Sequence, residues 1–372
     1  MGRGRKAAIG GLAVLALGVA AWHPVRDYQR SACVLTKLAG DECGALLPER
    51  AVRTEELEFD ANVGKVRARV YRPEGGAGSA LVLIHGVHED GYDEPRLMGF
   101  ARAIASQGVT VMTPHLRLLA EFQVDPRTVA TIGDAAEVLA RREGRKVGLM
   151  GLSFSGGLAL MAAARPEYAE YVDSVVAIGS HGSMARVARF LATDKIERPD
   201  GTTGTAEAHD YGIMVVVDQY PEDFFPKADA AKAREALGQW IAGDYEKAQQ
   251  VQKQLPYEAQ QRLYLLFSGK GQELKPELLK FIAAHEREMD AVSPQGKLGG
   301  LKANVYLLHG GADTVIPPAE SEWLAREVPP GKLRALVISP LITHVELAEK
   351  PATGDYWRVL DALRQILHEM EN

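Results

Sequence analysis

The residue with the clearest potential for chemistry is a serine placed between a buried strand and a helix. The segment Val147-Gly-Leu-Met-Gly-Leu-Ser-Phe-Ser-Gly-Gly157 follows this pattern. Small residues two positions before and after a serine let the chain turn sharply and lift the hydroxyl above a sheet. Ser153 has Gly151 before it and Ser155 after it. We favour Ser153 as the nucleophile because the apolar strand ends directly before it, and Ser155 is the alternative.

An aspartate and a histidine in the last quarter of the sequence complete a catalytic arrangement. A serine hydroxyl needs a base, and the base needs a third group that orients it. Asp313 follows the apolar run Asn304–Leu308, and His344 follows the next run, Leu333–Ile338. Catalytic groups of open α/β sheets gather at the carboxyl ends of strands. The sequence therefore predicts a triad of Ser153, Asp313 and His344, in the chain order known for such sites.

Two backbone amides are predicted to form an oxyanion hole, the site that binds the negatively charged oxygen of the reaction intermediate. One belongs to Phe154, the residue after the nucleophile. The other belongs to Val87, or alternatively to His88, in the segment His85-Gly86-Val87-His88 that ends an earlier apolar run. Gly86 would allow the backbone to approach a substrate closely.

The remaining histidines near strand ends are interpreted as structural. His85 and His309 each precede a glycine and are expected to form hydrogen bonds within turns. The series His85-x-x-His88-Glu89-Asp90 could suggest a metal site, but its spacing would require a helix, whereas the run before it is a strand. We therefore expect no metal site and no cofactor.

The order of apolar runs and helical patterns indicates the architecture. Strand and helix patterns alternate through residues 51–180 and again through 301–372, which predicts a mostly parallel central sheet covered by helices. A hairpin of Glu55–Asp60 and Lys65–Arg72 precedes the alternation.

About 120 residues, 181–300, interrupt the alternation. They are rich in Ala, Glu, Lys, Gln and Leu, and two long helices are predicted in them, Ala228–Leu255 and Pro276–Met289. We interpret the segment as an inserted helical cap over the site. Its carboxylates Asp210 and Asp218 are expected to be solvated.

Taken together, these motifs resemble the α/β-hydrolase fold over residues 51–372. The match is to capped bacterial esterases and to hydrolase domains related to prolyl oligopeptidases, although Ser155 replaces the last glycine of the elbow motif and no triple-glycine loop is present. The resemblance implies cofactor-free acyl transfer to water, with a small-molecule carboxylic ester as the favoured substrate. Peptide hydrolysis is the first alternative, and a non-catalytic binding protein on the same scaffold is the second.

The N-terminal segment indicates export. Met1 to Lys6 carry three positive side chains, and residues 7–22 carry none, the pattern of a secretory signal. Both a cleaved signal peptide and an uncleaved membrane anchor fit this pattern. If the segment is an anchor, it is expected to bring the protein into contact with the membrane. A periplasmic or extracellular body agrees with the cysteines, because Cys33 and Cys43 are the only two in the chain and are predicted to pair.

The segment that follows, residues 23–50, is interpreted as a tether. The net charge of −6, without a long basic run, argues against a nucleic-acid partner. The sequence leaves the oligomeric state open.

We expect residues 1–50 to export a fused reporter that is active only outside the cytoplasm. The physical reason is the basic and then apolar start, which export machinery recognises. Reporter activity in intact cells measures the outcome. A fusion in which Lys or Glu replaces three of the apolar residues serves as the control, and equal activity of the two fusions would contradict the prediction.

Overall fold

A computed structural model describes residues 25–38, 41–43, 49–342 and 353–371. The predicted signal or anchor at 1–22 and the predicted base His344 lie outside these residues. Within them, eight strands form one sheet in the order β1-β2-β4-β3-β5-β6-β9-β10. The strands are β1 Val52–Ala61, β2 Gly64–Pro73, β3 Ser79–Ile84, β4 Val109–Pro114, β5 Val147–Leu152, β6 Val172–Ile178, β9 Asn304–Gly310 and β10 Leu333–Ser339.

The strand pairing confirms the predicted, mostly parallel sheet. The β1–β2 and β2–β4 pairs are antiparallel, and all other neighbouring pairs are parallel. Strands β3, β4 and β5 are almost wholly buried, as expected for strands that are covered on both faces. Because the parallel strands run the same way, β3, β5, β9 and β10 end at the same edge of the sheet.

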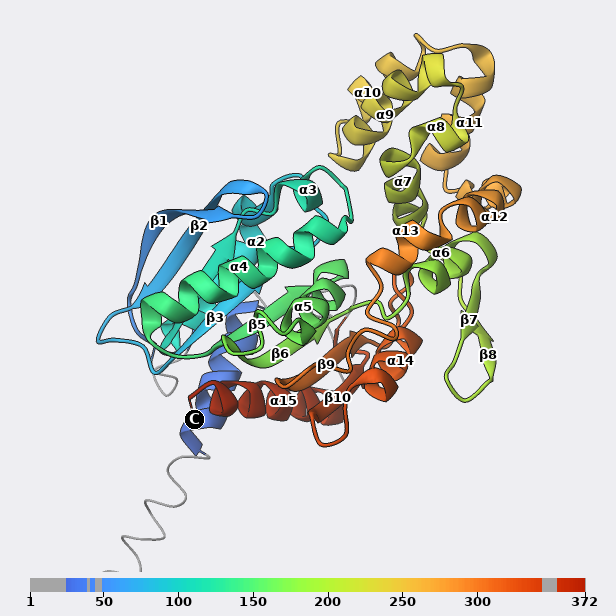
Figure 1. Cartoon of the computed structure of the whole chain (residues 1–372). Helices are drawn as coiled ribbons and strands as arrows, with labels where there is room; N and C mark the ends of the chain where they lie inside the picture. Colours follow the sequence, from blue (N-terminus) through green and yellow to red (C-terminus); the bar gives the residue numbers. More distant parts are fainter. Residues whose placement is uncertain (1–24, 39–40, 44–48, 343–352, 372) are drawn as a thin grey trace, which may run out of the picture.

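Helices cover both faces of this sheet (Figure 1). Residues of α4, α5 and α14 pack into one core, and those of α2 and α15 pack into the core on the other face. The bounds of these helices are α2 Pro95–Ser106, α4 Pro126–Glu143, α5 Phe154–Ala164, α14 Ala319–Glu327 and α15 Thr353–Glu371. Two short helices, η1 Gly91–Asp93 and α3 Arg117–Ala120, follow β3 and β4.

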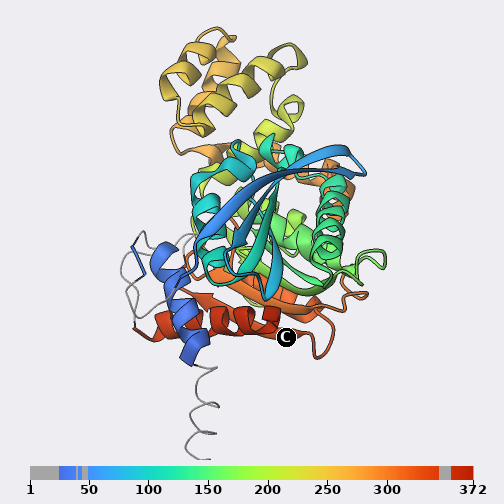
Figure 2. The same ribbon diagram turned by 90° about the vertical axis from the view of Figure 1, so that its left-hand side faces the viewer.

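The segment expected to be a tether contains a helix at residues 25–38 that packs against the body. Its Val34 and Leu35 are buried in the same core as α2 and α15, and Figure 2 shows it beside α15. The Tyr28 hydroxyl donates a hydrogen bond to Asp361 on α15 at 2.9 Å. Among the described residues, no helix has both the length and the apolar character needed to cross a membrane.

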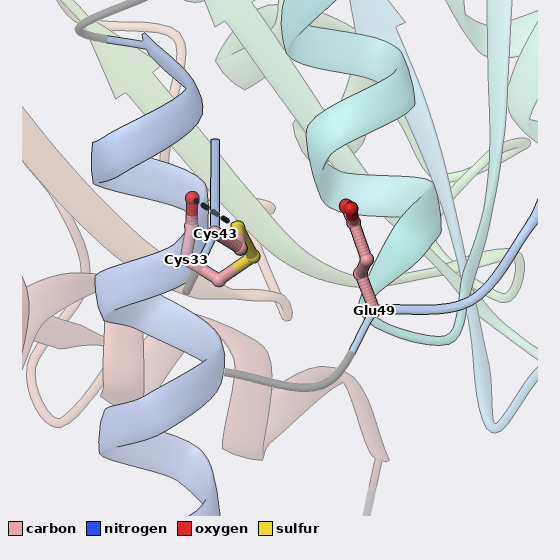
Figure 3. Close-up of side chains that lie close together, drawn as sticks. All are labelled: Cys33, Cys43 and Glu49. Atoms are coloured by element: carbon pink, nitrogen blue, oxygen red, sulfur yellow. Dashed lines mark hydrogen bonds between the residues drawn. A yellow bond between two sulfur atoms is a disulfide. The ribbon is translucent and has the colours of Figure 1, made fainter. Parts of the chain in front are cut away.

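A disulfide joins Cys33, within this helix, to Cys43, which follows it (Figure 3). Glu49 lies close to the two sulfur atoms, but its carboxylate pairs with Lys37 at 2.5 Å. Cysteine ligates metals as a thiolate, which a disulfide does not offer. The disulfide and the ion pair between Lys37 and Glu49 therefore both attach the N-terminal helix to the residues that follow it.

Residues between β6 and β9 form the insertion, which rises from the sheet and ends in a distal group of helices (Figure 1). Its elements are α6 Met184–Thr193, β7 Lys195–Glu197, β8 Thr203–Thr205, α7 Asp210–Gln219, α8 Pro221–Phe224, α9 Lys227–Ile241, α10 Tyr245–Gln252, α11 Tyr257–Phe267, η2 Gly271–Leu274, α12 Lys275–Ala284 and α13 Glu286–Ala291.

The structure corrects three expectations about the insertion. The predicted helix Ala228–Leu255 is two helices, α9 and α10, because Gly243 has a positive φ of 81° between them. The predicted helix Pro276–Met289 is likewise divided at His285. Asp218 is buried instead of solvated and pairs with Arg234 of α9 at 3.3 Å.

A buried ion pair attaches the base of the insertion to helix α14, which covers one face of the sheet. The Glu320 carboxylate on α14 accepts hydrogen bonds from the Arg186 guanidinium on α6 and from the amides of Gly182 and Ser183. The side chains of Arg186 and Glu320 are 8% and 2% exposed. Because removing one partner leaves the other charge buried and unpaired, this contact is costly to break.

We expect Glu320→Ala to lower the free energy of unfolding by about 3–5 kcal/mol, the usual cost of orphaning a buried charge. Denaturant unfolding at neutral pH measures it. The matched control is Glu322→Ala on the same helix, whose partly exposed pair with Arg198 should contribute less than about 1 kcal/mol. Equal losses in the two variants would contradict the assigned role of Glu320.

Candidate active site

Ser153 occupies a strained turn between β5 and α5. Its φ and ψ are 57° and −135°, a combination that a residue with a side chain rarely adopts. Ser153 N–H donates to the Ile178 carbonyl of the neighbouring strand β6 at 2.8 Å, which fixes the turn to the sheet. The residue is 7% exposed and lines a cavity.

Close packing of small residues allows this turn. A Cβ on Gly151 would lie 2.5 Å from the backbone of Gly156, and one on Gly156 would lie 1.9 Å from the hydroxyl of Ser180. The same Ser180 hydroxyl donates to the Ser153 carbonyl at 2.9 Å. The close contact between β5 and α5 therefore depends on Gly156, three residues after Ser153, and not on the residue two positions after it.

Ser155, the alternative nucleophile, lies in a different environment. It is fully buried, and its hydroxyl donates to the Leu152 carbonyl at 2.7 Å and lies 3.2 Å from the Ile84 carbonyl. It does not line the cavity that Ser153 lines. Its hydrogen bonds instead join the elbow to strand β3.

Asp313 lies in the loop after β9, at the same edge of the sheet as Ser153. Its Oδ1 accepts the amides of Val315 and Ile316 at 2.9 and 3.0 Å, and Val315 lines the cavity. His309 bonds to the Ser321 hydroxyl and the Ile316 carbonyl, in agreement with a structural role. His344 follows β10 but lies outside the described residues.

The loop after β3 passes directly beside the elbow. An added Cβ on Gly86 would lie 3.5 Å from the Ser153 Cβ, so this backbone reaches the serine. The His85 ring donates from Nδ1 to the Gly86 carbonyl at 2.7 Å and accepts the Leu116 amide at Nε2 at 3.0 Å. Burial lowers the pKa of His85 to about 4, so the ring is neutral at neutral pH.

This histidine determines the direction of the Val87 amide. The peptide between Gly86 and Val87 is planar and trans, so its carbonyl and its N–H point in opposite directions. Because His85 holds the carbonyl, the Val87 N–H is held as well. Both predicted amide donors, Val87 and Phe154, belong to residues that line the cavity with Ser153.

The cavity has a volume of about 350 Å³ and is lined by residues from four parts of the chain. The sheet edge contributes Ser153 and its neighbours, and the insertion contributes Tyr211 of α7 and Ile241 of α9. Leu38, at the end of the N-terminal helix, forms part of the wall. Charged groups of α2 and the loop before it lie at this cavity too, among them the ion pair Glu94–Arg96.

A second cavity of about 50 Å³ lies on the insertion side of the first. Phe154, Gly212 and Val215 line both cavities and form the wall between them. Most other residues around the second cavity are apolar side chains of α6, α7, α12 and α13. An apolar recess therefore lies next to the elbow.

Sequence reasoning missed the contribution of α7. The Tyr211 hydroxyl donates to the Val87 carbonyl at 3.0 Å, and the His209 amide donates to the Thr314 carbonyl, next to Asp313, at 2.8 Å. These partners are separated by about a hundred residues, and no local motif surrounds Tyr211. No pattern in the sequence would have indicated the contacts.

We expect His85→Asn to weaken the acid sensitivity of folding. The pKa of His85 in the folded protein lies below its value of 6.5 in the unfolded chain, so stability is lost as the pH falls from 6.5 towards 4. For a fully buried group this loss is about 3 kcal/mol. Unfolding free energies at pH 7 and pH 4.5 should differ less in the variant than in the wild type. His88→Asn, at a partly exposed histidine of the same loop, should keep the wild-type difference in stability between the two pH values. If His85→Asn also kept that difference, the role assigned to His85 would be wrong.

No protein-family model and no curated protein matches the sequence. Solved structures match it in fold. An acylaminoacyl peptidase bound to Z-Gly-Gly-Phe-chloromethyl ketone is 13% identical with a TM-score of 0.50, over 87% of this chain and 42% of that one. An esterase from Pyrobaculum calidifontis is 18% identical with a TM-score of 0.48, over 93% and 91% of the two chains.

A dienelactone hydrolase from Anabaena variabilis is 17% identical with a TM-score of 0.44, over 86% of this chain and 96% of the other. At these identities the likeness concerns the fold alone, and the chain spans less than half of the acylaminoacyl peptidase. The order and direction of the strands and the helices on both faces give the same conclusion. This chain has the α/β-hydrolase fold.

Proposed function

We propose that this protein is a serine hydrolase that cleaves carboxylic esters, with Ser153 as its nucleophile. The observation that carries the proposal is the strained backbone of Ser153 at the edge of a cavity. Strain of this kind persists only where the surrounding structure imposes it, and it is found predominantly at functional sites. Here it presents a hydroxyl to a cavity that is lined by backbone able to bind an oxyanion.

The proposed reaction proceeds through an acyl-enzyme. The Ser153 oxygen attacks the ester carbonyl, and His344 accepts the hydroxyl proton and returns it to the leaving alcohol. Water then attacks the acyl-enzyme, with His344 again accepting and returning the proton, and the acid is released. Asp313 orients the imidazole, a role that suits its burial and its two backbone hydrogen bonds, which hold one carboxylate oxygen in place.

The developing negative charge on the carbonyl oxygen is proposed to be bound by two amides. Phe154 is the first residue of α5, and the amides of a first helical turn have no acceptor within the helix. The helix N-terminus also favours negative charge. The second donor is the Val87 amide, whose direction His85 fixes.

The size of the cavity supports a small-molecule acyl substrate. About 350 Å³ is within the range of small-ligand sites, and the insertion covers one side of it. The apolar recess beyond Phe154 suits a hydrocarbon part of such an ester. Peptide hydrolysis is the competing reaction, and assays with matched ester and amide substrates of one acyl group distinguish the two.

We propose that the protein is exported and acts outside the cytoplasm, with residues 1–22 as its signal peptide or membrane anchor. The disulfide between Cys33 and Cys43 supports it, since such bonds persist in oxidising compartments. The reporter fusion described above tests this part separately. We propose that the reaction needs no cofactor and that the protein has no nucleic-acid partner.

We expect a fluorophosphonate probe to label the wild-type protein at Ser153, because only an activated serine attacks phosphorus readily. Ser153→Ala and His344→Ala should each abolish labelling and lower ester turnover by several orders of magnitude. Asp313→Asn should fold and lose about 10⁴ in kcat, by analogy with the best-studied serine protease triad. Peptide mapping of the labelled protein and ester kinetics measure these outcomes.

Ser155→Ala is the matched control. It removes a structural hydrogen bond and should reduce activity modestly while labelling persists. Labelling that is lost in Ser155→Ala but kept in Ser153→Ala would assign the other serine. A folded wild-type protein that takes no small probe would favour the non-catalytic binding role.

A further inference from the structure

The first turn of α7 is attached to two loops at the edge of the sheet. The His209 amide donates to Thr314 in the loop that carries Asp313, at 2.8 Å. Two residues on, the Tyr211 hydroxyl donates to the Val87 carbonyl in the loop after β3, at 3.0 Å. The His209 ring caps the helix by accepting the Tyr211 amide, which ties the two attachments together.

These contacts hold Val87 from both sides. The peptide before Val87 is held by His85, which belongs to the core of the fold. The peptide after Val87 is held by Tyr211, which belongs to the insertion. With both peptide planes held, the backbone dihedrals of Val87 are constrained, and so is the direction of its N–H.

Tyr211 is itself held rigidly. A Cβ on the adjacent Gly212 would lie 2.6 Å from the Leu191 side chain, so α7 packs tightly on α6. The neighbouring Asp210 accepts the amide of Gly271 at 3.1 Å. Burial raises the pKa of Tyr211 to about 12, so its hydroxyl keeps its proton and donates throughout the physiological range.

We infer that Tyr211 is a positioning residue through which the insertion holds the oxyanion loop in its productive conformation. The inference rests on the proposed function and extends it. The insertion covers the cavity and also completes the catalytic geometry. A displacement of α7 that broke the hydrogen bond between Tyr211 and Val87 would weaken transition-state binding before it changed substrate access.

The variant Tyr211→Phe tests this inference because it removes only the hydroxyl and leaves the buried Val87 carbonyl without its donor. We expect kcat for a small ester to fall about tenfold, the effect of one such hydrogen bond, with KM unchanged within about twofold. A trifluoromethyl ketone, which Ser153 converts to a bound oxyanion, should bind about tenfold more weakly. The corresponding methyl ketone, which does not form this adduct readily, should bind equally well.

Tyr168→Phe is the matched control. Tyr168 lines neither cavity, and its hydroxyl donates a hydrogen bond to the Asp134 carboxylate at 2.8 Å. This variant should keep the wild-type kcat and the wild-type affinity for both ketones. Titration with the fluorophosphonate probe gives the concentration of folded active sites, and each kcat is calculated from that concentration. Partial misfolding therefore cannot produce an apparent loss of kcat.

Three results would overturn the inference. A kcat within twofold of wild type in Tyr211→Phe, or a change in KM alone, would show that the hydrogen bond does not position the loop. A loss beyond a hundredfold would mean that the hydroxyl contacts the oxyanion directly. A wild-type protein without esterase activity or labelling would overturn the proposed function and this inference with it.

Discussion

The left-handed backbone of Ser153 is the constraint on which the rest of the site depends. Such a conformation costs of the order of 1–3 kcal/mol, so it must be maintained by its surroundings. Three elements maintain it here. Strand β6 accepts the Ser153 amide, Ser180 donates to the Ser153 carbonyl, and the contact between Gly151 and Gly156 brings β5 and α5 together. The strain is therefore maintained at the junction of two strands and a helix.

The insertion divides into a part that belongs to this rigid framework and a part that extends from it. Helices α6 and α7 are fastened to the core by the Arg186–Glu320 pair and by the contacts of His209 and Tyr211. Helices α9, α10 and α11 lie farther out and form a lobe of their own (Figure 1). Variation in the outer lobe can therefore alter the approach to the cavity while the inner helices keep the site intact.

Features with a local cause were predictable from the sequence, and features that depend on distant partners were not. Continuous apolar runs identified the buried strands, and the small residues around Ser153 indicated the elbow. Gly243 divides the predicted helix, whereas Gly238 lies within α9, so the residue type alone did not indicate where the helix would break. The burial of Asp218 depends on Arg234 of another helix, and Tyr211 depends on a loop 124 residues away. The pattern of apolar and polar residues within either segment gives no indication of these distant partners.

The N-terminal helix at residues 25–38 contributes to both the core and the cavity. Its Leu38 is part of the wall of the cavity that holds Ser153, and its Val34 and Leu35 fill the core beneath α2 and α15. The disulfide at Cys33 then closes the helix onto the following residues. Shortening the protein to its sheet and covering helices would open the pocket to solvent and expose apolar surface. This helix thus supports both the core and the wall of the cavity, and any shortened form of the protein should retain it.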